Sequence, residues 1–252
     1  MKEQKRVSGK IHSFETFGAA DGPGLRFVLF LQGCNLRCKY CHNPDTWSTN
    51  AYSKIMSAED VSKEIIKYKN YFGKKGGLTV SGGEPLLQPD FLIELFRLMK
   101  SENVHVAIDT SGAEYSEKDK RFETLLSLTD LVLLDIKHID DEKCRALTGK
   151  GNGQTLAFAK KLSELKIPVW IRQVLVPCLT DDETDLKKTR EWIDSLDNVV
   201  KTEVLPYNTL GKIKYEKLGI PYPMGEVLSP TETEIEKAKK ILVGTREGYM
   251  NF

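Results

Sequence analysis

Six short apolar runs alternate with helical patterns along this chain of 252 residues, and this alternation constrains the fold more than any other feature. The predicted strands cover residues 25–31, 78–80, 104–108, 131–134, 168–176 and 199–205. Continuous apolar strands separated by helices are typical of a parallel sheet covered by helices. Six units are too few for a closed eight-stranded barrel. We therefore expect an α/β fold of the partial (β/α)6 barrel type, a curved parallel sheet with outer helices. A doubly wound open sheet is the alternative.

Helical patterns fill the segments between these strands. The predicted helices cover residues 57–72, 89–100, about 117–128, 155–165 and about 180–196, and a last helix opens at residues 229–232. Ser57 with Asp60, and Thr180 with Glu183, have the spacing of N-terminal caps. No linker divides the chain. We expect a single domain over residues 1–252, with an N-terminal arm at about 1–24, a core at about 25–243 and a short C-terminal tail.

Composition and charge exclude several classes of protein. The formal net charge is +1, which does not indicate a nucleic-acid partner. No apolar run approaches the roughly 18 residues of a membrane span, and the polar N-terminus does not resemble a signal peptide. Only five cysteines are present, which is typical of the reduced cytoplasm. We expect a cytoplasmic protein without a membrane partner, and monomeric because nothing indicates an obligate oligomer.

Three of the cysteines, Cys34, Cys38 and Cys41, follow the first predicted strand with the spacing Cys-x3-Cys-x2-Cys. Thiols so close together in the sequence predict a metal centre. With only three protein ligands, a four-iron cluster keeps one iron open, as a catalytic zinc keeps an open position. The alternative is a structural zinc site with His42 as fourth ligand. Structural zinc sites usually join two separated pairs of ligands, and the sequence offers no second pair.

With the aromatic Tyr40 before the third cysteine, the run resembles the signature of radical S-adenosylmethionine enzymes. Neighbouring motifs narrow the resemblance to the activases of glycyl radical enzymes, in particular the family that acts on pyruvate formate-lyase. These motifs lie at residues 11–15, 21–27, 32–34, 40–47, 81–84, 109–110, 130–137, 169–172 and 205–207. The likeness runs from about Gly9 to the C-terminus.

This resemblance implies a set of site residues, most of them at the carboxyl ends of predicted strands. Cys34, Cys38 and Cys41 would bind one 4Fe-4S cluster. The residues implied to contact S-adenosylmethionine are Tyr40, His42, Gly82, Gly83, Glu84, Asp135, Ile136, Lys137, Arg172 and Asn208. A monovalent cation beside the cofactor would be held by Asp109, Thr110, the backbone of Leu133, and Asp135. Asn208 departs from the family, which usually has histidine there.

The implied activity is that of an oxidoreductase in anaerobic glucose metabolism. S-adenosylmethionine would be cleaved reductively, and a hydrogen removed from a backbone glycine of pyruvate formate-lyase to leave a glycyl radical. The electron would come from a small donor such as flavodoxin, and no side chain is needed as a general acid or base. Residues 21–24 would lie where the substrate loop docks, and the loop-rich segment 207–229 could border a lateral opening.

Two other functions stay open at this stage. One is an activase of a different glycyl radical enzyme, although only about fifteen residues separate Cys41 from the helix at Ser57, too few for a ferredoxin-like insertion. The other is a zinc-binding module without catalysis. Cys144 and Cys178 are expected to be free thiols, and His105 and His138 to be structural.

Overall fold

The computed structural model describes residues 6–49 and 53–243. One sheet has the strand order β3-β1-β2-β4-β5-β6-β7-β8. Its strands are β1 (Ser8–Gly18), β2 (Arg26–Leu31), β3 (Lys54–Ser57), β4 (Gly77–Gly82), β5 (His105–Thr110), β6 (Leu131–Asp135), β7 (Val169–Leu175) and β8 (Val199–Pro206). The predicted C-terminal tail, residues 244–252, lies outside the described residues.

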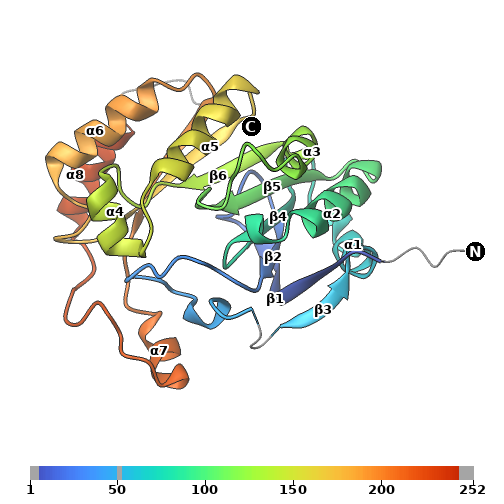
Figure 1. The fold of residues 1–252 in the computed structure, drawn as a ribbon, viewed down its shortest axis with the longest axis horizontal. Helices are drawn as coiled ribbons and strands as arrows, with labels where there is room; N and C mark the ends of the chain where they lie inside the picture. The colour runs from blue at the N-terminus through green and yellow to red at the C-terminus, as the bar shows by residue number, and fades with distance from the viewer. Residues whose placement is uncertain (1–5, 50–52, 244–252) are drawn as a thin grey trace, which may run out of the picture.

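Six strands, β2, β4, β5, β6, β7 and β8, pair in parallel, one for each predicted β-α unit. They form a curved sheet that does not close on itself (Figure 1). The prediction of a partial (β/α)6 barrel is therefore confirmed. The expected N-terminal arm contains a feature that the sequence analysis missed. Strand β1 pairs antiparallel with β2 and with the short β3, so eight strands rather than six make the sheet.

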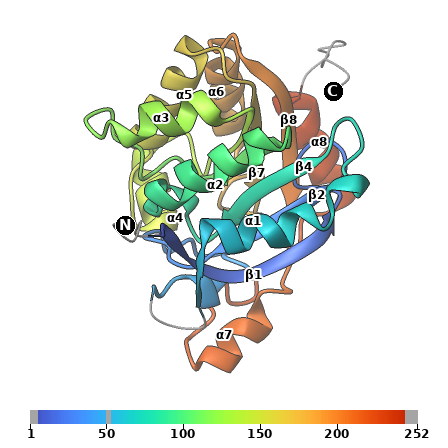
Figure 2. The same cartoon turned by 90° about the vertical axis from the view of Figure 1, so that its right-hand side faces the viewer.

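Eight α-helices accompany the sheet within the described residues. They are α1 (Ala58–Ile66), α2 (Pro89–Ser101), α3 (Arg121–Leu128), α4 (Asp141–Thr148), α5 (Gly153–Glu164), α6 (Glu183–Asp194), α7 (Lys212–Leu218) and α8 (Glu232–Leu242). Helices α1, α2, α3, α5, α6 and α8 cover the outer face of the sheet, whereas α7 projects from one end (Figures 1 and 2). Helices α4 and α7 were not predicted, because they bury too few apolar side chains to form a repeating pattern: Cys144 and Leu147 on α4, and Tyr215 on α7.

The structure corrects two predicted helix boundaries and confirms the start of the last helix. Ser57 does cap α1, since its hydroxyl accepts from the N–H of Asp60 at 3.1 Å, but the helix ends at Ile66 instead of residue 72. Helix α6 is capped by Asp182, whereas the predicted Thr180 donates to a strand carbonyl. The last helix opens within the predicted residues 229–232: Thr231 is its N-cap, and Glu234 completes the capping box.

Side chains alternate between the two faces of the sheet, the outer face under the helices and the inner face that borders a cavity. On β5, Val106 and Ile108 pack in the main core between the sheet and its helices. The intervening Ala107 packs in a small cluster with Leu133, while Asp109 lines a cavity at the strand ends. Because successive strand residues point to opposite faces, the same backbone carries an apolar outer face and a partly polar inner face. No helix among the described residues has the length and apolar content that crossing a bilayer requires.

Phe158 on α5 tests the main core. Its side chain is fully buried, and its ring centroid lies 5.0 Å from that of Tyr115. We predict that Phe158→Ala lowers the free energy of unfolding by about 3–5 kcal/mol, because burial is lost and a cavity remains. Urea unfolding followed by circular dichroism measures the change. Lys160→Ala, at an exposed position of the same helix, is the matched control. Equal stabilities for the two variants would contradict this packing.

Candidate active site

The carboxyl ends of the parallel strands open on a cavity of about 570 Å³. The three cysteines of the predicted cluster site lie on its wall. The other predicted residues that line it are Tyr40, His42, Gly82, Gly83, Glu84, Asp109, Thr110, Asp135, Lys137, Arg172 and Asn208. Ile136 and Leu133 do not line the cavity: the side chain of Ile136 packs in the main core, and that of Leu133 packs in the small cluster with Ala107. Thus predicted cluster and cofactor residues that are up to 174 positions apart in the sequence (34 to 208) share one cavity.

The cysteine loop leaves β2 through Gly33, whose φ of 107° favours glycine. Two backbone hydrogen bonds then close the loop on itself. The N–H of Gly33 donates to the carbonyl of Thr46 at 2.7 Å, and the N–H of Cys34 donates to the carbonyl of Trp47 at 3.2 Å. The loop also provides a hydrogen-bond donor for an unpaired carbonyl at the C-terminal end of α4, since the backbone N–H of Arg37 donates to the carbonyl of Thr148 at 2.7 Å. Helix α4, which was not predicted from the sequence, therefore holds one side of the cysteine loop.

Helix α7 holds the other side of this loop. The ring Nε2 of His42 donates to the backbone carbonyl of Asn208 at 2.9 Å. The ammonium of Lys214 lies 3.0 Å from the carboxylate of Asp45 in the short 3-10 helix η1 (Pro44–Thr46). Gly211 approaches so closely that a Cβ there would lie 3.0 Å from the Cα of His42. The hydrogen bond of His42 thus joins the cysteine loop to the segment before α7. The predicted contact of His42 with the cofactor stays a prediction.

Burial changes the chemistry of the cysteines. It raises the pKa of Cys34 to about 12 and that of Cys38 to about 11, and it also raises the pKa of Cys41. Such thiols ionise when a metal replaces their protons. Among residues 6–49 and 53–243, no group of three His, Cys, Asp or Glu side chains is arranged to hold a single ion. The fit to an iron–sulfur cluster rests on three thiol donors along one cavity wall.

Two glycines bring the end of β4 against the cysteine loop. Gly82 has a φ of 122°, and a Cβ on it would lie 2.2 Å from the backbone nitrogen of Leu31. A Cβ on Gly83 would lie 2.1 Å from the carbonyl oxygen of Gly33. The N–H of Glu84 donates to that same carbonyl at 2.8 Å. Only glycine fits at these positions. The Gly-Gly-Glu turn and the cysteine loop are therefore packed directly against each other.

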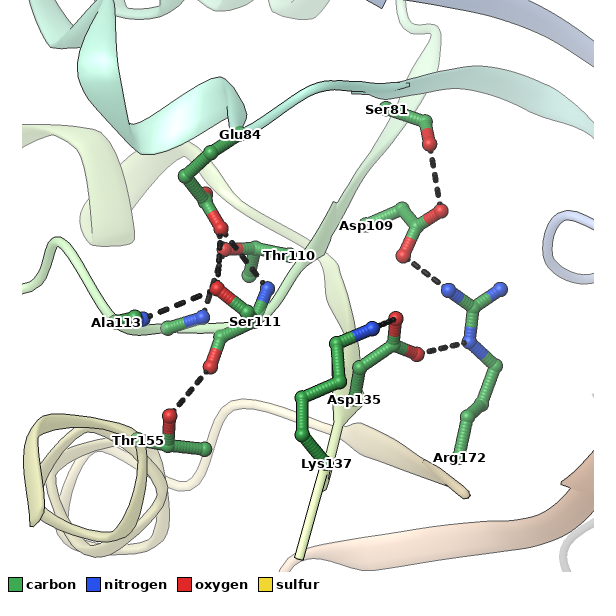
Figure 3. Close-up of polar contacts among 11 residues, drawn as sticks. Ser81, Glu84, Asp109, Thr110, Ser111, Ala113, Asp135, Lys137, Thr155 and Arg172 are labelled. Atoms are coloured by element: carbon green, nitrogen blue, oxygen red, sulfur yellow. Dashed lines mark hydrogen bonds and ion pairs between the residues drawn. The ribbon is translucent and has the colours of Figure 1, made fainter. Parts of the chain in front are cut away.

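The carboxylate of Glu84 ties this turn to the end of β5 (Figure 3). It accepts from the hydroxyl of Thr110 at 2.5 Å, from the hydroxyl and N–H of Ser111 at 2.6 and 3.0 Å, and from the N–H of Leu86 at 3.0 Å. Burial raises the pKa of Glu84, and these donors oppose the rise. The four donors stabilise a buried carboxylate and fix the wall of the cavity.

Arg172 lies between two carboxylates on neighbouring strands (Figure 3). Its Nε donates to Asp135 at 3.0 Å, and a terminal nitrogen donates to Asp109. Lys137 donates to Asp135 at 2.8 Å, and the hydroxyl of Ser81 donates to Asp109 at 2.6 Å. We call Ser81, Asp109, Asp135, Lys137 and Arg172 the charge network. Its two carboxylates and two cations balance, which a buried set of charges requires.

Burial and ion pairing shift the pKa values of the two carboxyl groups in the charge network in opposite directions. Burial raises the pKa of Asp109 to about 6, although Arg172 opposes the rise. Burial would also raise the pKa of Asp135, but Arg172 and Lys137 outweigh it and lower that pKa below its ordinary value. Asp109 and Asp135 already have cationic partners, and Thr110 already donates to Glu84. The monovalent cation site therefore stays a prediction.

The structure also places residues in the cavity that the sequence analysis had not assigned to the cofactor. Ser81 and Ser111 hold the buried carboxylates, and their only signal in the sequence is a polar residue beside a predicted ligand. Asp21, expected near the substrate loop, reaches the cavity wall. Burial raises the pKa of Asp21, and both Arg172 and Arg26 oppose the rise.

Comparisons with known proteins agree with this geometry. The chain matches the sequence model described as the Radical SAM superfamily over residues 28–190. It is 50% identical over 250 residues to a pyruvate formate-lyase-activating enzyme of Staphylococcus epidermidis, covering 98% of this chain and 96% of that one. A second relative of that name, from Streptococcus mutans, is 47% identical and covers 95% and 93% of the two chains.

Solved structures support the fold. A radical SAM methyltransferase from Sphaerobacter thermophilus superimposes with a TM-score of 0.60 at 15% identity, covering 86% of this chain and 63% of that one. A domain of a pyruvate-formate lyase-activating enzyme from Bacteroides vulgatus superimposes with a TM-score of 0.55 at 24% identity, covering 67% and 93%. The chain therefore belongs to the radical SAM superfamily and, within it, to the pyruvate formate-lyase-activating enzymes.

Proposed function

We propose that this chain is a radical SAM enzyme that activates pyruvate formate-lyase by removing a hydrogen from one of its backbone glycines. The observation that carries this proposal is the shared cavity. Three thiols, the Gly-Gly-Glu turn and the charge network open on the same space, in a chain half identical to activases of that name over nearly its whole length.

The residues of the cavity have distinct proposed roles. Cys34, Cys38 and Cys41 would hold a 4Fe-4S cluster, leaving one iron free of protein ligands. The cluster and S-adenosylmethionine, when bound, supply the radical chemistry that removes the hydrogen. Gly82 and Gly83 offer backbone close to the cysteine loop, and Glu84 fixes that backbone through four donors. No acid–base step is assigned to any of these side chains.

The charge network is the proposed site for the charged groups of S-adenosylmethionine. Lys137 and Arg172 would face its carboxylate, and Asp135 would accept from its ribose hydroxyls or stabilise its positive charge. The network is neutral before the cofactor arrives. S-adenosylmethionine adds one carboxylate and two positive groups, so its excess positive charge would be balanced outside the network, by the thiolates of the cysteine loop. Tyr40 and Asn208 would line the remaining wall.

The remaining parts of the proposal concern partners. The glycine of pyruvate formate-lyase would enter beside Asp21, whose carboxylate lies on the cavity wall. A small electron carrier such as flavodoxin would reduce the cluster. We propose that the enzyme works as a monomer in the cytoplasm. The direct test mixes anaerobically reconstituted enzyme with pyruvate formate-lyase, S-adenosylmethionine and a reductant. A glycyl radical signal in electron paramagnetic resonance is expected, and a signal only with another glycyl radical enzyme would reassign the substrate.

The cysteines give a matched set of variants. We predict that Cys34→Ser, Cys38→Ser and Cys41→Ser each abolish the glycyl radical signal and lower bound iron, because a thiolate ligand is lost. Cys144→Ser and Cys178→Ser should retain about four irons and four sulfides per chain. Iron and sulfide assays on anaerobic preparations measure the difference. One zinc per chain in place of iron would instead support the zinc module.

Gly83 tests the contact between the Gly-Gly-Glu turn and the metal loop. We predict that Gly83→Ala weakens S-adenosylmethionine binding and destabilises the protein by about 1–3 kcal/mol, because a Cβ would overlap the carbonyl of Gly33. Calorimetric titration and thermal unfolding measure the two effects. Gly153→Ala on α5 is the control, since no heavy atom lies within 4 Å of a Cβ there. Unchanged binding in Gly83→Ala would contradict the proposed role of the turn.

Arg172 tests the charge network. We predict that Arg172→Gln destabilises the protein by about 3–5 kcal/mol, because two buried carboxylates lose their shared cation. It should also weaken S-adenosylmethionine binding at least tenfold, which is about 1.4 kcal/mol. The double variant Arg172→Gln with Asp109→Asn should recover much of the stability while binding stays weak. Recovery of binding in the double variant would show that Arg172 serves only the fold.

A further inference from the structure

The turn between β1 and β2 carries Asp21 to the wall of the central cavity. Asp21 precedes β2 in the sequence, whereas the cysteine loop follows that strand, and both line the same cavity. We infer that Arg26 and Thr79 are positioning residues that hold Asp21 at this wall, where the substrate glycine would enter. The inference rests on the proposed function, because it concerns the protein substrate of that reaction.

A continuous chain of hydrogen bonds joins these three residues. The Nε of Arg26 donates to the hydroxyl of Thr79 at 2.9 Å. The same hydroxyl donates to the backbone carbonyl of Asp21 at 2.6 Å. Arg26 and Thr79 are fully buried, so water does not compete for either bond. Loss of the hydroxyl would leave both a buried donor and a carbonyl without their partner, which is costly.

The guanidinium of Arg26 is held by acceptors from several segments. It donates to the ring Nδ1 of His105 at 3.2 Å and to the carbonyl of Leu78. The carbonyls of Pro23 and Lys75 each lie 3.5 Å from a terminal nitrogen. Since these acceptors belong to β4, β5 and the turns beside them, Arg26 is fixed relative to the sheet.

The protonation states of Arg26 and His105 suit this arrangement. Burial lowers the pKa of Arg26 to about 10, so the guanidinium keeps its charge at neutral pH. Burial, and then the charge of Arg26, lower the pKa of His105 to about 4. The ring of His105 is therefore neutral at neutral pH, and its Nδ1 can accept from a group that has only donors.

Two glycines let the turn lie directly against this anchor. Gly22 has a φ of 131°, and a Cβ on it would lie 3.3 Å from the Nε of Arg26. A Cβ on Gly18, at the end of β1, would lie 2.7 Å from a carboxylate oxygen of Asp21. The backbone of the turn is thus held from one side by Arg26, and the carboxylate of Asp21 is limited from the other side by β1.

Arg26 also acts on Asp21 through its charge. Burial raises the pKa of Asp21, and Arg172 and then Arg26 oppose the rise. Arg172 has two carboxylate partners of its own, whereas every acceptor that Arg26 contacts in the described part of the chain is neutral. The charge of Arg26 therefore favours an ionised Asp21. A carboxylate held at one position can accept a backbone N–H from an entering peptide.

Thr79→Val tests the link, because valine has nearly the shape of threonine but no hydroxyl. We expect the KM of the reconstituted enzyme for pyruvate formate-lyase to rise about tenfold, since a misplaced orienting group loses much of its effect. Iron content and the dissociation constant for S-adenosylmethionine should stay unchanged, because Thr79 does not line the cavity. Thr79→Ser keeps the hydroxyl and should restore the KM. Rates of glycyl radical formation, iron assays and calorimetric titration measure these quantities.

Thr189→Val on α6 is the matched control. The hydroxyl of Thr189 is also buried and donates to the backbone carbonyl of Asp185 at 2.8 Å, outside the cavity. Both valine variants lose a buried hydroxyl, so thermal unfolding should show similar losses of stability. Only Thr79→Val should change the KM. Arg26→Lys keeps the charge but cannot reach every acceptor, and should raise the KM as well; if it does not fold, the Thr79 variants decide.

A double variant shows whether the link acts through Asp21. Asp21→Ala alone should raise the KM, and adding Thr79→Val should raise it no further, because no carboxylate remains to be positioned. Additive effects would overturn the inference. An unchanged KM in Thr79→Val, or equally weakened binding of S-adenosylmethionine, would overturn it too. An unmodified enzyme that forms no glycyl radical on pyruvate formate-lyase would instead contradict the proposed function, before any variant is compared.

Discussion

The close approach of two backbone segments, the end of β4 and the start of the cysteine loop, is the constraint on which the rest of the site depends. Gly83 lies where a Cβ would be 2.1 Å from the carbonyl of Gly33, and that carbonyl accepts the N–H of Glu84. The two segments cannot move independently without breaking this bond. Any ligand that contacts the Gly-Gly-Glu turn is therefore held at a fixed position relative to the three cysteines.

The buried polar groups around this contact are paired almost completely, and their pairing explains how the cavity tolerates them. Glu84 accepts four hydrogen bonds, and Arg172 joins the carboxylates of Asp109 and Asp135. Burying an isolated charge here would destabilise the protein by several kcal/mol. A cation shared between two carboxylates offsets roughly that desolvation penalty. The arrangement holds the side chains rigidly, so a cofactor meets groups that are already oriented.

Two short helices give the metal loop its surroundings. The last carbonyls of α4 accept from the backbone of the loop, and its far side is contacted by Lys214 of α7 and by Gly211, which precedes that helix. Leu36 and Cys38 of the loop also pack in an apolar cluster with Leu147 of α4 and Met224. This packing limits the access of water to the thiols. Radical chemistry in such a site requires that exclusion, because water competes for reactive groups.

The sequence by itself determined the order of β-α units, the three cysteine positions and most of the cavity wall, because each depends on local patterns. Apolar strands, glycines at strand ends and the cysteine spacing can all be found without knowing which segments meet. Strand β1 was missed because its burial follows no strict alternation, and α4 and α7 because each buries only one or two apolar side chains. Only the tertiary structure decided the partners of the charged groups. Asp109 and Arg172 are 63 positions apart, and their contact follows from the pairing of neighbouring strands. The curvature of the parallel sheet, which no local pattern encodes, turns polar residues from separate strands into one site.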